Sequence, residues 1–220
     1  MIAVIDYGRG NLGSVEKAFE RVGIPAVVTE DPRAVDEAAA VVLPGDGAFH
    51  DAMANLESRG LLDALRRALD GTRPFLGICL GYQLLFSTSE EFGDGRGLDV
   101  ISGVVRRFPS GPKVPHMGWN QVEHDGSLAL FDGIPSGAHF YFVHSYYPEV
   151  GELAGSRADA RPLGGSDVPR TAFAWCDYGL RFPAAVQRGR IHATQFHPEK
   201  SQRWGIRMLE NFAALVKSGG

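Results

Sequence analysis

The first hundred residues alternate short apolar runs with segments whose apolar residues recur at helical spacing. Uninterrupted apolar runs predict strands over residues 2–5, 26–29, 41–43 and 75–78. Three helices are predicted between and after these strands. The apolar face of the first consists of Val15, Ala18, Phe19 and Val22, and that of the second consists of Leu61, Leu62, Leu65, Ala68 and Leu69. The third helix is predicted over residues 80–86. Strands without polar alternation are covered on both faces, so we expect a doubly wound α/β fold with a mostly parallel central sheet.

The second half of the chain has a different pattern. Short strand-like segments separated by Gly, Pro and Asp are predicted over residues 98–107, 119–122, 139–144, 171–175, 184–186 and 191–195. They would extend the sheet with antiparallel strands, and a last helix is predicted over 203–217. Residues 151–170 are interpreted as a long surface loop, so we expect one domain over 1–220.

Composition and charge narrow the class of protein. The chain is 44% hydrophobic with a formal charge of -4, which does not favour a nucleic-acid partner. Its apolar runs are shorter than the roughly 18 residues of a membrane span, and the first residues do not follow the pattern of a signal peptide. The two cysteines, Cys79 and Cys176, favour neither a disulfide framework nor a zinc site. We expect a cytoplasmic enzyme that associates with neither membranes nor nucleic acids.

The strongest local signal surrounds Cys79. An apolar strand is predicted to end there and a helix to begin at once, and Gly77 and Gly81 stand two residues on either side. This G-x-C-x-G pattern is the cysteine counterpart of the nucleophile elbow, a turn too tight for neighbouring Cβ atoms. The helix N-terminus favours the thiolate, and the N–H of Leu80 would be placed to stabilise an oxyanion. Cys176 lacks flanking glycines of this kind and is interpreted as a small buried side chain.

A partner for this nucleophile is predicted near the C-terminus. His197 and Glu199 are two residues apart at the end of a predicted strand, so both side chains would project from one face. Pro198 biases His197 towards extended backbone, and Ser201 is predicted to cap the last helix. The imidazole could then act as the base and the carboxylate could orient it. The other six histidines lack metal-binding spacing, so neither a metal nor a cofactor is expected.

These motifs together resemble the class I (triad-type) glutamine amidotransferases, whose fold is flavodoxin-like. The resemblance rests on Gly77-Ile-Cys-Leu-Gly-Tyr-Gln83 and Gln195-Phe-His-Pro-Glu199. Three further stretches are similar to the glutaminase subunits of imidazole glycerol phosphate synthases: residues 5–12, residues 114–120 and residues 141–146. The matching motifs extend from residue 5 to residue 201.

The resemblance implies roles for particular residues. Cys79 would be the nucleophile, His197 the acid and base, and Glu199 its orienter, with the N–H groups of Leu80 and Gly47 forming the oxyanion hole. Substrate glutamine would be held by Gln83, Glu91, Ser145 and Tyr146. The face towards a partner would include His116, Met117, Trp119, Asn120 and Tyr141.

The resemblance also implies the reaction and the partner. The chain would hydrolyse glutamine to glutamate and ammonia through a cysteinyl thioester. A separate (β/α)8-barrel cyclase subunit, bound as a heterodimer, would take the ammonia and make imidazole glycerol phosphate and an aminoimidazole carboxamide ribotide (AICAR) in histidine biosynthesis.

One residue departs from the family pattern. Asp46 stands between Gly45 and Gly47, where the family commonly has a small aliphatic residue. A carboxylate pointed at an oxyanion would oppose catalysis, so we expect Asp46 to face away or to be hydrogen-bonded, with a role in holding the loop inactive.

Three alternative functions stay open at this point. The chain could serve another synthase (for pyridoxal phosphate, anthranilate or GMP), act alone as a cysteine hydrolase on γ-glutamyl peptides, or be a catalytically silent binding module. Constitutive glutamine hydrolysis by the isolated chain would favour the free hydrolase. Unchanged glutamine-dependent synthesis after Cys79→Ala would favour the silent module.

Overall fold

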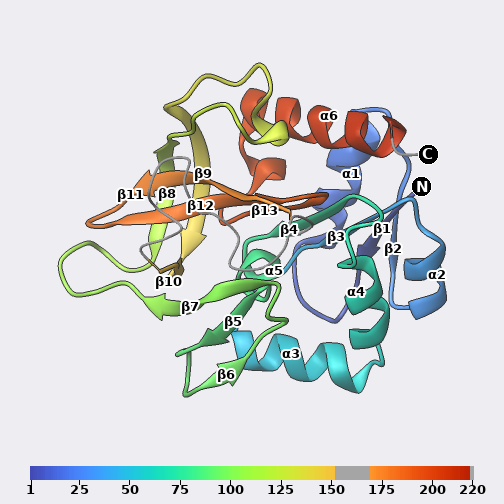
Figure 1. The fold of residues 1–220 in the computed structure, drawn as a ribbon, viewed down its shortest axis with the longest axis horizontal. Coiled ribbons are helices and arrows are strands. Elements are labelled where there is room, and N and C mark those ends of the chain that lie inside the picture. Colours follow the sequence, from blue (N-terminus) through green and yellow to red (C-terminus); the bar gives the residue numbers. More distant parts are fainter. Residues whose placement is uncertain (152–168, 219–220) are drawn as a thin grey trace.

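The computed structural model describes residues 1–151 and 169–218 (Figure 1). The elements of the first half are β1 (Ile2–Ile5), α1 (Leu12–Arg21), β2 (Ala26–Thr29), α2 (Pro32–Glu37), β3 (Ala40–Leu43), α3 (Phe49–Ser58), α4 (Leu62–Ala68), β4 (Phe75–Ile78), α5 (Leu80–Gln83), β5 (Phe86–Ser89), β6 (Gly95–Arg96) and β7 (Ile101–Arg107). Those of the second half are β8 (His116–Val122), β9 (Ala138–His144), β10 (Tyr146–Glu149), β11 (Thr171–Asp177), β12 (Arg181–Arg188), β13 (Ile191–Thr194) and α6 (Gln202–Ser218), with single 3-10 turns at Ala129–Phe131 and Pro198–Lys200. Most of the predicted surface loop, residues 152–168, lies outside the described residues.

A seven-stranded sheet forms the centre of the molecule, in the order β11-β12-β13-β4-β3-β1-β2. Strands β13, β4, β3, β1 and β2 are parallel, whereas β12 pairs antiparallel with β13 and β11 antiparallel with β12. The predicted mostly parallel sheet with an antiparallel extension is therefore confirmed. Because β4 and β13 are adjacent and parallel, the residues that follow them meet at one edge of the sheet.

Helices cover both faces of this sheet (Figure 1). Along β1, Ile2 and Val4 contribute to the apolar cluster under α1 and α6, whereas Ala3 and Ile5 contribute to the cluster that includes α3 and α4. Phe19 of α1 and Phe212 of α6 lie 5.9 Å apart, which joins the two helices on one face. Successive strand side chains thus enter opposite cores, and this accounts for the uninterrupted apolar runs in the sequence.

Two smaller sheets lie beside the central one. A four-stranded sheet has the order β10-β7-β5-β6, and β8 and β9 form a separate antiparallel ribbon. The prediction placed the segments over 98–107, 119–122 and 139–144 in an extension of the central sheet, and this is wrong: within residues 1–151 and 169–218, the antiparallel extension consists of β11 and β12. An isolated bridge between Glu123 and Trp175 connects the ribbon to β11.

The helix predicted over 80–86 is shorter than expected. It ends at Gln83, and Phe86 begins strand β5. Leu84, Leu85 and Phe86 are all fully buried, so their apolar character reflects burial rather than one face of a helix.

Helix α2 was not predicted from the sequence. It begins at Pro32, and the carboxylate of Asp31 caps it by accepting a hydrogen bond from the N–H of Arg33.

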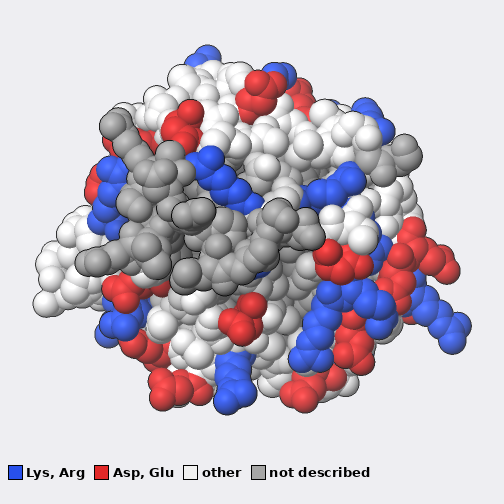
Figure 2. Space-filling model, viewed as in Figure 1, with Lys and Arg blue, Asp and Glu red and all other residues white. Residues whose placement is uncertain are grey.

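The charged side chains visible in Figure 2 are of both signs and are intermingled. Ion pairs on the surface include Arg67 with Asp36 at 2.7 Å and Arg59 with Glu30 at 2.7 Å. Among the described residues, none of the helices is both long enough and apolar enough to span a membrane.

Candidate active site

Cys79 is the residue at which β4 turns into α5. Its N–H donates to the carbonyl of Thr194 at 2.8 Å, which ties the turn to β13, and its backbone has a φ of 55°. A positive φ combined with its ψ of -107° is uncommon for a residue with a side chain, and such strained backbone is often found at functional sites. The strand, the turn and the helix are those predicted for a nucleophile elbow.

The two glycines beside the turn are required by close backbone contacts. A Cβ on Gly81 would lie 1.8 Å from the carbonyl oxygen of Leu43 on β3. A Cβ on Gly77 would lie 2.8 Å from the carbonyl oxygen of Gly81. Both distances are shorter than real Cβ contacts, so the elbow packs against its own helix and against β3 only when these positions lack side chains.

His197 and Glu199 form the predicted pair, but on a different backbone. Nδ1 of His197 lies 2.8 Å from Oε1 of Glu199, and the two side chains are only 8% and 2% exposed. Strand β13 ends at Thr194, and Pro198–Lys200 is a 3-10 turn, so the contact does not come from strand alternation. His197 itself is extended, with φ -100° and ψ 100°, and the turn after it brings the carboxylate back to the imidazole.

The imidazole of His197 is poised to carry a proton. Burial lowers its pKa, but the nearby Cys79 and the hydrogen bond to Glu199 outweigh burial and raise the pKa to about 10. Because Nδ1 contacts the carboxylate, Nε2 is the nitrogen available to the thiol, and it has no hydrogen-bond partner among the described residues. A base held by a carboxylate beside a thiol is the arrangement needed for nucleophilic catalysis.

Two contacts of the thiol were not predicted from the sequence. The carbonyl of Val143 on β9 and Nε2 of Gln195 each lie 3.8 Å from Sγ of Cys79. Gln195 is fully buried, and its Oε1 accepts a hydrogen bond from Nε2 of Gln83 at 2.9 Å. Gln195 belongs to the motif that contains His197, but only the parallel pairing of β13 with β4 shows that its side chain reaches the cysteine.

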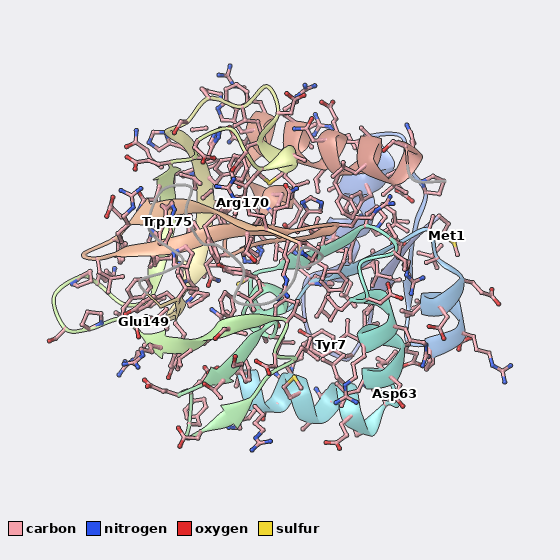
Figure 3. All side chains as sticks on the ribbon, in the orientation of Figure 1. Met1, Tyr7, Asp63, Glu149, Arg170 and Trp175 are labelled. Atoms are coloured by element: carbon pink, nitrogen blue, oxygen red, sulfur yellow. The ribbon has the colours of Figure 1, made fainter. Side chains whose placement is uncertain are left out.

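The loop after β3 packs against the elbow. A Cβ on Gly45 would lie 2.0 Å from the hydroxyl of Tyr7, a buried side chain on the side of the central sheet that carries α3 and α4 (Figure 3). Gly47 has a φ of +88°, which favours glycine. Asp46 is exposed, and its Oδ1 accepts a hydrogen bond from the N–H of Gly10 at 3.1 Å. The expectation of a hydrogen-bonded Asp46 is therefore confirmed, whereas a role in holding the loop inactive stays a prediction.

A pocket of about 780 Å³ opens in front of the cysteine. Its lining includes the triad candidates, the 44–47 loop and all four residues predicted to hold glutamine, namely Gln83, Glu91, Ser145 and Tyr146. Glu91 accepts a hydrogen bond from the N–H of Phe49 at 2.7 Å, and burial raises the pKa of its carboxyl group. The pocket therefore combines a thiol, an imidazole–carboxylate pair and further polar groups at the carboxyl edge of the sheet.

Comparison with known proteins agrees with this geometry. The family described as Glutamine amidotransferase class-I matches residues 3–216. The chain belongs to this family. The imidazole glycerol phosphate synthase subunit HisH of Moorella thermoacetica is 51% identical over 221 residues, covering 100% of this chain and 97% of the relative. The subunit of the same name from Syntrophotalea carbinolica is 50% identical over 222 residues, covering 98% of this chain and 100% of the relative.

Solved structures show the same fold at low sequence identity. A crystal structure described as glutamine amidotransferase has a TM-score of 0.71 with 19% identity, covering 99% of this chain and 100% of that one. The glutaminase domain of Trypanosoma brucei CTPS, with bound acivicin, has a TM-score of 0.66 with 17% identity, covering 99% and 93%. The fold predicted for a class I glutamine amidotransferase is thus confirmed.

The residues predicted to face a partner divide between two sides of the ribbon formed by β8 and β9. Met117 is 62% exposed and Trp119 is 47% exposed, and Tyr141 lies next to Trp119 with ring centroids 6.1 Å apart. His116, by contrast, is 3% exposed, so its predicted place on the surface is wrong. Side chains alternate along a strand, so His116 and Asn120 lie on the face opposite Met117 and Trp119.

Ser201 also differs from the prediction. Its hydroxyl donates to the carbonyl of His197 at 2.6 Å and accepts from the N–H of Tyr141 at 2.9 Å. It therefore joins the backbone at the Pro198–Lys200 turn to β9 instead of capping the last helix with its side chain.

The raised pKa of His197 predicts how stability depends on pH. Below pH 6.5 the imidazole is protonated in both the folded and the unfolded chain, so its favourable contacts contribute fully. Between pH 6.5 and about 10 the unfolded chain loses this proton while the folded chain keeps it, so that contribution is lost. We expect the free energy of unfolding to fall over this interval, by at most about 1.4 kcal/mol per pH unit.

Glu199→Gln tests this dependence, because glutamine cannot supply the negative charge that favours the imidazolium. We expect denaturant unfolding between pH 7 and 9.5 to show a shallower decline for this variant than for the wild type. The matched control is Glu210→Gln on α6, whose carboxylate lies 3.7 Å from Arg207 and is 48% exposed; its curve should parallel the wild type. Equal slopes for Glu199→Gln and the wild type would contradict a pKa of His197 raised by Glu199.

Proposed function

We propose that this chain is the glutaminase subunit of an imidazole glycerol phosphate synthase, with Cys79, His197 and Glu199 as its catalytic triad. Two lines of support converge. HisH subunits from several organisms are about half identical to the chain over nearly its whole length. Cys79 and His197 are 118 residues apart in the sequence. Their side chains nevertheless line one pocket together with the carboxylate of Glu199. The presence of the complete triad in that pocket is the observation that carries the proposal.

The reaction begins at the thiolate of Cys79. It attacks the side-chain carbonyl carbon of glutamine, and the carbonyl oxygen becomes an oxyanion. The N–H of Leu80, first in α5 and so without a partner within the helix, faces this charge, and the N–H of Gly47 supplies the second donor. His197 then protonates the departing nitrogen, the C–N bond breaks, and ammonia leaves behind a thioester.

Hydrolysis of the thioester completes the cycle. His197 takes a proton from water, the hydroxide attacks the thioester carbonyl, and the C–S bond breaks to release glutamate and the thiolate. Glu199 keeps Nδ1 protonated throughout, so Nε2 is the nitrogen that exchanges the proton. Gln83 and Glu91 hold the substrate, and the Ser145–Tyr146 backbone binds its amino-acid end.

The partner that uses the ammonia is a (β/α)8-barrel cyclase that binds the face of Met117, Trp119 and Tyr141. This face is directly connected to the triad, because the carbonyl of Tyr141 accepts a hydrogen bond from the N–H of His197 at 3.0 Å. Direct transfer of ammonia between the two subunits would also keep it reactive, because ammonia that is protonated in bulk water is no longer a nucleophile. A partner that presses on the ribbon therefore acts on the backbone that holds the base.

Co-expression with a barrel cyclase tests this function. The complex should convert glutamine and the phosphoribulosyl formimino substrate into imidazole glycerol phosphate, AICAR and glutamate in equal amounts. Trp119→Ala should weaken the complex by about tenfold or more in dissociation constant, because an exposed aromatic side chain at an interface is a frequent hot spot. Val27→Ala is the control, as Val27 is 43% exposed on β2, at the opposite edge of the central sheet from β11 and the ribbon. Glutamine hydrolysis without synthesis would instead favour a free-standing hydrolase.

A further inference from the structure

Two histidines outside the triad are buried beside the pocket. His116 is 3% exposed and His144 is 7% exposed, and Nδ1 of His116 lies 2.9 Å from Nε2 of His144. The two residues are register partners on β8 and β9, so the contact crosses the ribbon. Buried polar groups cost stability unless they are hydrogen-bonded, and this pair satisfies that requirement in part by bonding to itself.

Aromatic rings hold both imidazoles in place. The rings around the pair are those of Phe108, Phe142, Tyr178 and Phe182. Tyr178 is the closest, stacked on His116 with ring centroids 3.9 Å apart. Burial lowers the pKa of His116 to about 4 and that of His144 to about 3. Both are neutral at pH 7, so each has one donor nitrogen and one acceptor nitrogen.

The direction of each hydrogen bond in this group follows from its last acceptor. The carbonyl of Tyr146 can only accept, so Nδ1 of His144, 2.7 Å away, carries the proton and Nε2 is an acceptor. His116 must then donate from Nδ1, which leaves its Nε2 to accept from the amide of Asn120 at 3.2 Å. The hydrogen bonds therefore run one way, from Asn120 through both imidazoles to Tyr146.

The carbonyl of Tyr146 is where this chain of hydrogen bonds enters the pocket. It accepts a second hydrogen bond from Nε2 of Gln83 at 2.9 Å. Gln83 also donates to Gln195, whose amide reaches the thiol of Cys79. The carbonyl of Tyr146 thus connects the buried histidines, through Gln83 and Gln195, to the thiol of Cys79.

The hydrogen bond from His144 to the carbonyl of Tyr146 also fixes a corner of the backbone. His144 is the last residue of β9 and Tyr146 the first of β10, so the contact closes the turn around Ser145. On the other side, the carbonyl of Ser145 accepts from the N–H of Phe108 at 3.1 Å. With both carbonyls held, the peptide groups that follow Ser145 and Tyr146 are fixed in orientation at a corner whose two residues line the pocket.

We propose that His116 and His144 are positioning residues for glutamine binding: their one-directional hydrogen bonds hold the Ser145–Tyr146 corner in the orientation that recognises the amino-acid end of the substrate. They touch neither the reacting carbonyl nor the thiol. The inference rests on the proposed function, because it takes that corner as part of the glutamine pocket. It predicts an effect on substrate affinity rather than on the reactivity of Cys79.

The test uses the double variant His116→Phe/His144→Phe in complex with the cyclase. Phenylalanine keeps the ring packing. The groups that contacted the imidazoles keep other partners, because the carbonyl of Tyr146 still accepts from Gln83 and the amide of Asn120 still donates to the carbonyl of Asp177. The thermal midpoint should therefore not fall. We expect the KM for glutamine to rise about fivefold to tenfold, from the loss of one net hydrogen bond, with a much smaller change in kcat. The alkylation rate of Cys79 by iodoacetamide, which has no amino-acid end, should match the wild type.

Rescue and control variants separate positioning from simple packing. His144→Asn restores an amide donor close to the place of Nδ1, so its KM should be nearer the wild type than that of His144→Leu. His192→Gln is the matched control, because His192 is 2% exposed on β13 but lines a different cavity, and its KM should not change. These single variants also decide the question if the double variant does not fold.

The outcomes are distinct from those that test the function. A wild-type complex without glutaminase activity would overturn both the proposed function and this inference. A glutaminase whose KM is the same in His144→Leu, His144→Asn and the wild type would overturn the inference alone. A parallel loss of midpoint, kcat and alkylation rate would show that the pair only packs the core, and would also overturn it.

Discussion

Cys79→Ala will abolish glutamine-dependent synthesis by the complex and leave ammonia-dependent synthesis intact. Without the thiolate no thioester can form, and neither the proposed oxyanion donors nor His197 can supply a nucleophile of comparable strength. Removal of the nucleophile from a triad lowers kcat by roughly 10⁶-fold in a well-studied protease, so we expect a loss of at least about 10³-fold here. Free ammonia at high pH enters the reaction after this step, so its use by the cyclase should be unaffected.

The control for this variant is the other cysteine. Cys176 on β11 is 2% exposed, and burial raises the pKa of its thiol to about 12. Cys176→Ala should therefore retain glutamine-dependent synthesis and should not affect labelling by iodoacetamide near neutral pH. Residual glutamine-dependent synthesis above a hundredth of the wild-type rate in Cys79→Ala would sink the assignment of the nucleophile.

The elbow could be predicted from the sequence because its determinants are local. A strand of four buried residues, a cysteine and two flanking glycines lie within seven positions, and each glycine is required by a contact within the turn or with the adjacent strand. The pairing of His197 with Glu199 was also predicted, although for a different backbone reason. A spacing of two residues allows the contact both in a strand and, as here, across a proline that begins a 3-10 turn.

What the sequence could not reveal depends on pairing between distant strands. Gln195 reaches the thiol only because β13 is parallel to β4, and Val143 only because β9 passes beside the elbow. His116 was assigned to the surface together with its neighbours Met117 and Trp119. Strand alternation over 116–120 separates the two sets, because His116 and Asn120 lie on one face of β8 and Met117 and Trp119 on the other.

Gly81→Ala is the substitution with the largest expected effect on the fold. Its Cβ would lie 1.8 Å from the carbonyl oxygen of Leu43 and 2.8 Å from the carbonyl carbon, and both belong to backbone that β3 holds in the sheet. Neither atom can move without breaking the β3–β4 pairing. We expect a loss of at least about 3 kcal/mol in the free energy of unfolding, or a midpoint lower by about 6–12 °C, measured by thermal unfolding.

Gly13→Ala provides the contrast, because the two substitutions add the same methyl group. Gly13 is exposed within α1, and among the described residues a Cβ there would meet nothing within 4 Å beyond its chain neighbours and the backbone of its own helix. Alanine favours helix over glycine, so this variant should be more stable than the wild type by about 0.5–1 kcal/mol. If Gly81→Ala unfolded at the same temperature as Gly13→Ala, the elbow could not be packed as tightly against β3 as these distances require. Because α5 carries the N–H of Leu80, any shift that accommodates the methyl group also moves a donor of the proposed oxyanion hole. Glutaminase activity in Gly81→Ala should therefore fall even at temperatures where the chain remains folded.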